Sequence, residues 1–247
     1  MASDEIIVER TASDIVRETS VDELEAAASG PTLTEDLALQ LLKRNDLPAE
    51  ILERIGKNGA VAKSRKVKLA LIKHPHTPRH VSMPMLRHLF TFDLMHVALA
   101  PVVPADVKLA AEETLIRRLE TISIGEKLSL ARRASGRVSG ELLLDPEPRV
   151  VSTALENSRL TEAAVIKVLM RQNVTAKFVE LVCHHPKWSV RREVRIALLQ
   201  NEKTSLARAL EFARSLPASL IPEILEASRL PTHIKAHLLR EMAEQSN

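Results

Sequence analysis

The sequence predicts an all-α protein in which short helices stack side by side as an α-solenoid, a superhelix of repeated units. Three observations support this prediction. Only six Gly occur among 247 residues, and the tracts between prolines are rich in Leu, Ala, Arg and Glu, a composition that favours helices. Apolar residues recur at steps of three and four. One short helix-start phrase also returns along the chain, and repetition of this kind indicates a stacked array.

The repeated phrase marks the predicted helix starts. In most copies an apolar residue precedes a Pro or Thr, two variable residues follow, and a second apolar residue opens an amphipathic stretch. Pro suits the first helical turn because its missing N–H removes no bond, and Thr can cap that end. The copies lie at residues 47–51, 77–81, 103–107, 160–165, 174–178, 216–220 and 230–234.

A second phrase marks the predicted helix ends. Asn or His follows a pair of apolar residues at 41–45, 70–74, 154–157, 181–184 and 198–201. Asn tolerates left-handed backbone geometry, and Asn and His side chains can bond loose carbonyl groups where a helix ends. We therefore expect these side chains to be structural and not catalytic.

Charge divides the chain into an acidic leader and a basic body. Residues 1–36 carry a net charge of −8 and the remainder carries +11. The breaker cluster Ser29 Gly30 Pro31 predicts a boundary there, with residues 1–33 as a flexible leader and residues 34–247 as the helical repeat domain. Ser20 and Glu23 resemble a capping box, which would start a short helix through Ala28. The leader is either solvated or folds back on the basic body and competes with an acidic ligand.

A resemblance to known repeat families rests on two stretches. Residues 144–151 and 185–192 place a Pro-containing turn before Val and Arg, and an Ala-Leu pair follows. Here the chain resembles the bacterial HEAT-like and leucine-rich-repeat-variant (LRV) helical repeat proteins, most clearly from about 140 to 205. The resemblance implies a curved α-solenoid with a concave binding face and a role as a binding scaffold. Uneven spacing of the helix starts leaves open whether each unit is a helical pair or a single helix.

The predicted partner-binding residues fall in two groups. Residues 54–92 hold nine Lys and Arg, four His and no Asp or Glu. Because like charges repel, this segment predicts an acidic protein surface or a nucleic-acid backbone as partner. A solvated face, or a contact with the acidic leader, is the alternative. The predicted contact residues are Lys57, Lys63, Arg65, Lys66, Lys68, Lys73 and Arg79, together with Trp188, Arg191, Arg192 and Arg195 of the second group.

Trp188 admits two interpretations. Its ring either stacks on a base or fills the core of a repeat turn. In size and repeat type the chain also resembles the alkylpurine DNA glycosylases built from HEAT-like repeats, which place a catalytic Asp four residues after a Trp. Arg192 occupies that position here. This departure disfavours DNA repair as an alternative function.

The sequence gives little support for metal binding, cofactor binding or catalysis. His74, His76, His80, His88 and His96 are close in sequence, but no metal-binding spacing accompanies them, and no nucleotide-binding or hydrolase motif occurs. We expect no cofactor, no metal, no catalytic residue and no membrane partner. The single Cys183 and the absence of an apolar N-terminal signal predict a buried thiol and a cytoplasmic protein.

Overall fold

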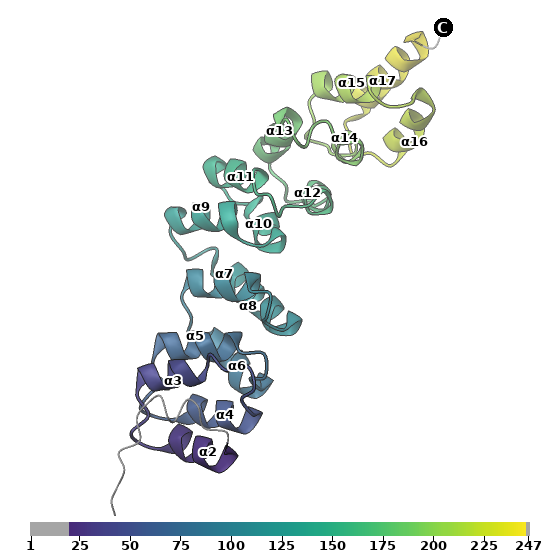
Figure 1. The fold of residues 1–247 in the computed structure, drawn as a ribbon. Coiled ribbons are helices and arrows are strands. Elements are labelled where there is room, and N and C mark those ends of the chain that lie inside the picture. Colours follow the sequence, from purple (N-terminus) through teal and green to yellow (C-terminus); the bar gives the residue numbers. More distant parts are fainter. Residues whose placement is uncertain (1–19, 246–247) are drawn as a thin grey trace, which may run out of the picture. The chain divides into compact units, whose positions relative to one another are not determined.

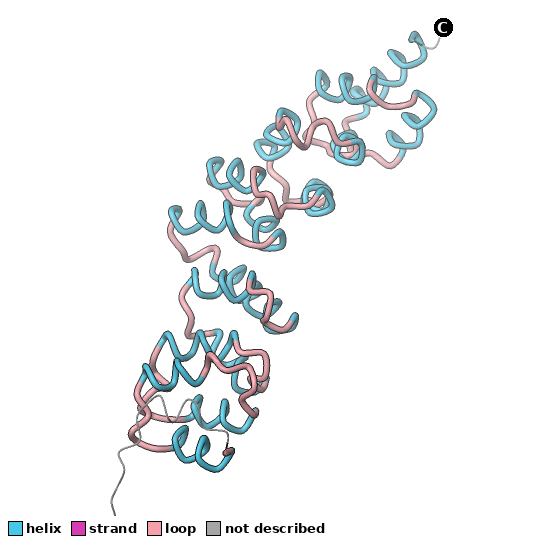
Figure 2. The backbone as a smooth tube through the Cα atoms, viewed as in Figure 1, coloured by secondary structure: helices cyan, strands magenta, loops and turns pink. Residues whose placement is uncertain are grey.

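The computed structural model describes residues 20–245, which form sixteen α-helices and one short 3₁₀ helix, with no strand in this range (Figures 1 and 2). The all-α prediction is therefore confirmed. The chain divides into two compact units, residues 1–115 and 116–247, and each is described by itself. Within the described range, no helix has the length and apolar character needed to cross a membrane.

The first unit is built from helices that pack on their second neighbours in sequence. Helix α2 contacts α4, α3 contacts α5, and α5 contacts α7. One cluster of buried aliphatic side chains runs from Leu24 to Leu71 and joins the first four helices of the unit. The helices are α2 (Val21–Ser29), α3 (Glu35–Leu41), α4 (Ala49–Lys57), α5 (Arg65–Lys73), α6 (Arg79–Leu86), α7 (Thr91–Leu99) and α8 (Ala105–Arg118), the last three residues of which fall in the second unit.

The second unit repeats this packing. Helix α9 contacts α11, α10 contacts α12, α11 contacts α13, α12 contacts α14, α14 contacts α16, and α15 contacts α17. Its helices are α9 (Ile124–Arg133), α10 (Gly136–Leu142), α11 (Pro148–Leu155), α12 (Glu162–Leu169), α13 (Ala176–His184), α14 (Arg192–Leu199), α15 (Leu206–Arg214), the 3₁₀ helix η1 (Ala218–Leu220), α16 (Ile221–Glu226) and α17 (Thr232–Gln245).

Each copy of the helix-start phrase contains the first residue of a helix, so the seven predicted starts are confirmed. Thr161 and Thr175 cap their helices through side-chain oxygens that accept bonds from the backbone N–H of Ala164 and Phe178. Pro48 and Pro78 occupy the N-cap position, one residue before the first turn in which they were expected. The fixed φ of Pro suits the extended backbone of a cap as well as the first turn.

The Asn and His residues past the helix ends connect each helix to an element about thirty residues earlier. Asn157 Nδ2 donates to Ala131 O at 2.7 Å and to Ala134 O at 3.2 Å. In the same way, His74 Nε2 lies 2.7 Å from Arg44 O. The further members of this set are Asn58, bonded to Ala28 O and Gly30 O, and Asn201, bonded to Leu169 O.

These side chains also accept a bond from the backbone N–H two residues later. Asn157 Oδ1 accepts from Arg159 N at 2.8 Å, and His74 Nδ1 accepts from His76 N at 3.3 Å. The predicted structural role is therefore confirmed for His74, Asn157 and Asn201. His184 is exposed, but its Nδ1 lies 2.8 Å from Glu180 O in the last turn of α13, as predicted for a helix end. Asn45 is exposed, and the buried place near His184 is taken by His185, which accepts from Lys187 N at 3.1 Å.

Part of the predicted leader belongs to the packed structure. Helix α2 begins after Ser20 and packs against α4, with Leu24 and Ala28 buried. The boundary predicted after residue 33 therefore falls inside folded structure, because breaker residues 29–31 connect two packed helices. The Ser20 side chain makes no capping bond to this helix. Residues 1–19 of the predicted leader lie outside the described residues.

Two glycines that follow serine caps give a direct test of this packing. A Cβ on Gly136 would lie 2.3 Å from Arg159 O, whereas a Cβ on Gly125 would meet nothing within 4 Å. We expect Gly136→Ala to lower the free energy of unfolding by about 1–3 kcal/mol, because the backbone at Arg159 must move. Gly125→Ala should raise it by about 0.5 kcal/mol through helix propensity. Urea unfolding measures both, and shifts of the same sign would contradict the close approach at Arg159.

Candidate partner-binding surface

Most basic side chains of residues 54–92 find acidic partners within the first unit, four of them on another helix and Lys57 on its own helix α4. Each partner lies outside the basic segment, so the charge excess within the segment is offset by the fold. The ion pairs are Arg54 with Glu25, Lys57 with Glu53, Arg65 with Asp93, Lys66 with Glu35 at 3.0 Å, and Arg79 with Asp106 at 2.5 Å. Glu25 belongs to the predicted leader, which therefore contacts the basic segment at this point.

The pair of Arg65 and Asp93 is the most elaborate of these contacts. Arg65 donates from Nε to Asp93 Oδ2 at 2.6 Å and from Nη2 to Oδ1 at 2.9 Å. Asp93 is only 3% exposed, and the bonds from Arg65 hold the pKa of its carboxyl below the usual range. The guanidinium also lies 4.9 Å from the centre of the Phe90 ring. Arg65 is thus held in place by its own protein, and its charge is already compensated.

Three lysines of the predicted site have no acidic partner among the described residues. Lys63 is exposed in the loop between α4 and α5, while Lys68 and Lys73 lie on α5. Lys43 was not predicted and is unpaired as well; it lies beside α5, where it lines a shallow hollow together with Ala70. We call Lys43, Lys63, Lys68 and Lys73 the unpaired lysines.

The sequence held a signal for Lys43 that the charge count missed. Lys43 and Lys73 follow the same pair of apolar residues in the helix-end phrase, thirty positions apart. Because α3 packs on α5, equivalent positions in the two phrases lie on neighbouring helices. A search for basic residues at equivalent phrase positions would have found it.

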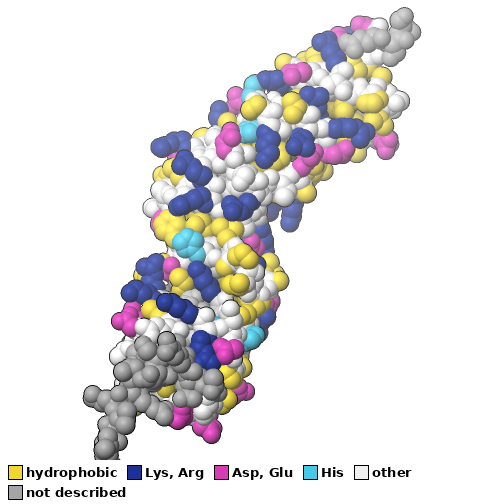
Figure 3. All heavy atoms as spheres, in the orientation of Figure 1, with side chains coloured by type: hydrophobic (Ala, Val, Ile, Leu, Met, Phe, Trp, Pro, Cys, Tyr) yellow, Lys and Arg dark blue, Asp and Glu magenta, His cyan; other side chains and the backbone are white. Residues whose placement is uncertain are grey.

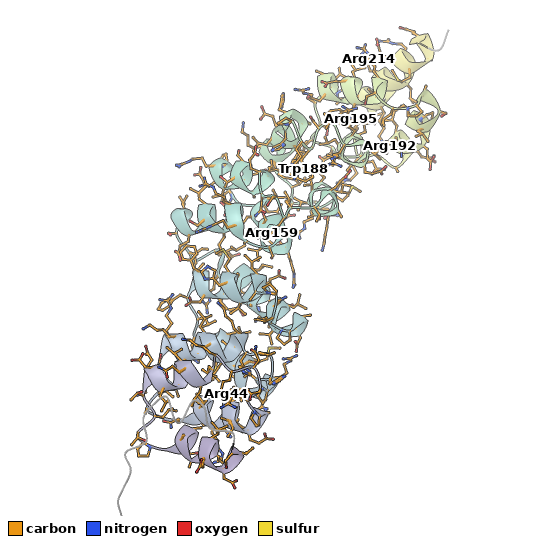
Figure 4. All side chains as sticks on the ribbon, in the orientation of Figure 1. Arg44, Arg159, Trp188, Arg192, Arg195 and Arg214 are labelled. Carbon is orange, nitrogen blue, oxygen red and sulfur yellow. The ribbon has the colours of Figure 1, made fainter. Side chains whose placement is uncertain are left out.

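Trp188 lies in the connection between α13 and α14 and belongs to the core of the second unit (Figure 4). It is 2% exposed, and its Nε1 donates to Leu155 O at 2.9 Å. Lys187 covers the ring, with Nζ 4.1 Å from its centre. The prediction that Trp188 contacts a partner is therefore corrected, because a buried ring offers no surface on which a base can stack.

The arginines after Trp188 are also engaged within the protein. Arg195 is half-buried, donates from Nε to Ser189 O at 2.7 Å, and lies 5.9 Å from the Phe212 ring centre. Arg192 is exposed and pairs with Glu193 at 3.2 Å. Arg191 is exposed, with its Nη1 3.8 Å from Glu162 Oε2. Of the three predicted arginines, Arg195 has a structural role, whereas Arg191 and Arg192 remain accessible at the surface.

The distribution of charge differs between the two units. Residues 20–115 contain twelve Lys and Arg against twelve Asp and Glu, and residues 116–245 contain twenty-one against fifteen. On the face seen in Figure 3, basic side chains are spread over both units, with acidic and apolar side chains between them. The basic excess of the described chain thus belongs to the second unit, although the densest basic segment lies in the first.

The remaining chemistry-bearing groups are part of the packing. Within residues 20–245, no cluster of three or more His, Cys, Asp or Glu has the arrangement of a metal site. Burial raises the pKa of the Cys183 thiol to about 11, so the thiolate needed for nucleophilic attack is scarce at neutral pH. Burial likewise lowers the pKa of His74, whose ring nitrogens bond backbone groups. Cys183 and His74 are thus part of the packing of the described chain.

Comparisons of the chain with protein-family models, with curated proteins and with solved structures return no match.

Proposed function

We propose that this chain is a non-enzymatic binding scaffold, a HEAT-like or LRV-type α-solenoid that engages an acidic partner through a basic surface. Contacts between second-neighbour helices within each unit support the repeat assignment, as do the buried bonds that recur at a spacing of about thirty residues. The observation that carries the binding role is the set of unpaired lysines. A cytoplasmic location is part of the same proposal, since the only Cys in the sequence forms no disulfide.

An acidic protein is the partner that the surface supports best. Backbone recognition of a duplex is favoured by a continuous basic strip, whereas acidic and apolar side chains lie among the basic ones on the visible face (Figure 3). Single-stranded nucleic acid requires aromatic platforms, but the whole sequence has only one Trp, four Phe and no Tyr. Of these five aromatic residues, Trp188, Phe178 and Phe212 are buried, and Phe90 is exposed with the Arg65 guanidinium 4.9 Å from its ring centre.

Reversing the charge of the four unpaired lysines tests this proposal. The variant Lys43→Glu/Lys63→Glu/Lys68→Glu/Lys73→Glu should bind polyglutamate about 30-fold more weakly than the native chain at low salt. The difference should shrink between about 50 and 200 mM salt, because screening weakens exposed charge interactions. Titration by fluorescence anisotropy measures both quantities, and a short DNA duplex serves as the second probe.

Lys177→Glu makes one such reversal at an exposed lysine of the second unit, which pairs with Glu180, and it is compared with each of the four single reversals of the unpaired lysines. It should leave binding nearly unchanged. Equal weakening by this control would show that net charge alone governs association. Tighter binding of the duplex than of polyglutamate would favour a nucleic-acid partner.

A further inference from the structure

Helices α4, α5 and α6 of the first unit line a pocket of about 350 Å³ that is open to solvent. This volume lies at the lower end of the range for ligand pockets, which suits one or two side chains. Its lining residues come from α4, from α5 with the loop before it, and from α6 with the residue pair after it. They are Gly56, Lys57, Ala62, Lys68, His80, Val81, Pro84, Met85 and His88.

The pocket combines a rim of Lys and His side chains with an apolar floor. Lys57, Lys68, His80 and His88 are among its lining residues, and no acidic side chain lines it. Glu53 contacts both Lys57 and His80, whose Nε2 lies 3.3 Å from the carboxylate. Lys68 has no acidic partner within the described chain. The rim therefore retains positive charge for a ligand.

Gly56 and Pro84 both line this pocket. Gly56 is the next-to-last residue of α4. A Cβ at this position would lie 3.0 Å from Val81 Cγ1 and 3.3 Å from Met85 Cε, so Gly56 permits the close approach of α6.

Pro84 lies inside α6 and has no N–H to donate to the His80 carbonyl. It thus differs from Pro222, which stands in the first turn of α16 and interrupts nothing. A departure from local helix preference is expected where a site is built, and Pro84 is such a departure in the lining of this pocket.

We propose that this pocket binds an acidic segment of a partner protein, with a Glu or Asp carboxylate at the lysine rim and an adjacent aliphatic side chain on Val81, Pro84 and Met85. This inference rests on the proposed function and identifies the chemistry of the partner. The phosphates of a nucleic-acid backbone can pair with the Lys side chains of the rim. They make no favourable contact with the apolar floor, because the exposed groups of the backbone are polar. A carboxylate joined to a Leu, Ile or Val side chain uses both features.

The test uses the full-length chain and a fluorescein-labelled, end-blocked peptide of sequence Leu-Glu-Leu-Leu-Glu-Leu. The variant Met85→Glu places a negative charge, of the same sign as the peptide, on the apolar floor. We expect it to weaken peptide binding about tenfold. Lys68→Glu should weaken it to a similar extent. A peptide with Leu replaced by Ser should bind the native chain about tenfold more weakly, although its charge is unchanged. Thermal unfolding of each variant establishes that the fold is intact.

Lys177→Glu is the matched control, because it makes the same charge change as Lys68→Glu at a residue outside both the pocket and the unpaired lysines. Unchanged peptide binding by Met85→Glu, together with no preference for Leu over Ser, would overturn the pocket while leaving the proposed basic surface in place. Failure of the four-lysine variant to affect polyglutamate would instead count against the proposed function itself. Competition by a DNA duplex at lower concentration than the peptide would also overturn the pocket assignment.

Discussion

Replacing Trp188 by Ala should lower the free energy of unfolding by about 3–5 kcal/mol, the range found when large buried aromatic side chains are truncated. The ring is almost fully buried and its Nε1 bonds Leu155 O at 2.9 Å. Truncation therefore leaves a cavity and also leaves a buried carbonyl without its donor. Chemical unfolding followed by circular dichroism measures the change.

The conservative variant Trp188→Phe separates the two contributions. It keeps an aromatic ring in the core but removes the donor to Leu155 O, so we expect a loss of about 1–3 kcal/mol. The DNA-repair alternative requires an accessible ring, and therefore expects loss of binding with little change in stability. Such an outcome for Trp188→Ala would contradict its role in the core.

Helix starts were predictable because they depend on chemistry within a few residues. Pro presets φ and Thr bonds the N–H three positions later, so the phrase at 174–178 is sufficient to begin α13 wherever that helix packs. Helices α5, α9 and α10 begin after Ser64, Ser123 and Ser135, whose hydroxyls cap them in the same way. The phrase did not include Ser, and these starts were missed.

The electrostatics of the candidate site were not predictable from a local count. The counter-ions of Arg65 and Lys66 are 28 residues later and 31 residues earlier, on helices that pack beside α5. A window over residues 54–92 sees the bases without these acids. The separation matches the spacing of the buried Asn and His bonds, so a charge map aligned on the repeat would have paired them.

The sequence could not decide between the two interpretations of Trp188 for a related reason. The sequence shows a Trp among Lys and Arg, which is typical of a nucleic-acid contact and equally of a core residue covered by charged neighbours. What decides between them is Leu155 O, whose position 33 residues earlier depends on the packing of successive repeats. The local pattern carries no information about that distant carbonyl.

Asn157→Asp should destabilise the second unit by more than about 3 kcal/mol at neutral pH, and the loss should diminish as the pH falls. Asn157 donates to Ala131 O and Ala134 O while accepting from Arg159 N, at a site that is only 1% exposed. A carboxylate has no hydrogen to donate, so it would face two carbonyl oxygens with a negative charge in a buried place. Unfolding by urea at several pH values measures the effect.

The direction of the pH dependence follows from the pKa of the Asp introduced at position 157. Burial beside carbonyl oxygens raises the pKa of the introduced Asp above its value of about 3.9 in the unfolded chain. The folded state then binds the proton more tightly, so stability is regained as the pH falls through the raised pKa, where the acid can donate to a carbonyl. Asn45→Asp, at an exposed helix end, should show no such recovery. A loss of stability in Asn157→Asp that does not change with pH would contradict the proposed effect of the buried bonds from Asn157 to Ala131 O and Ala134 O.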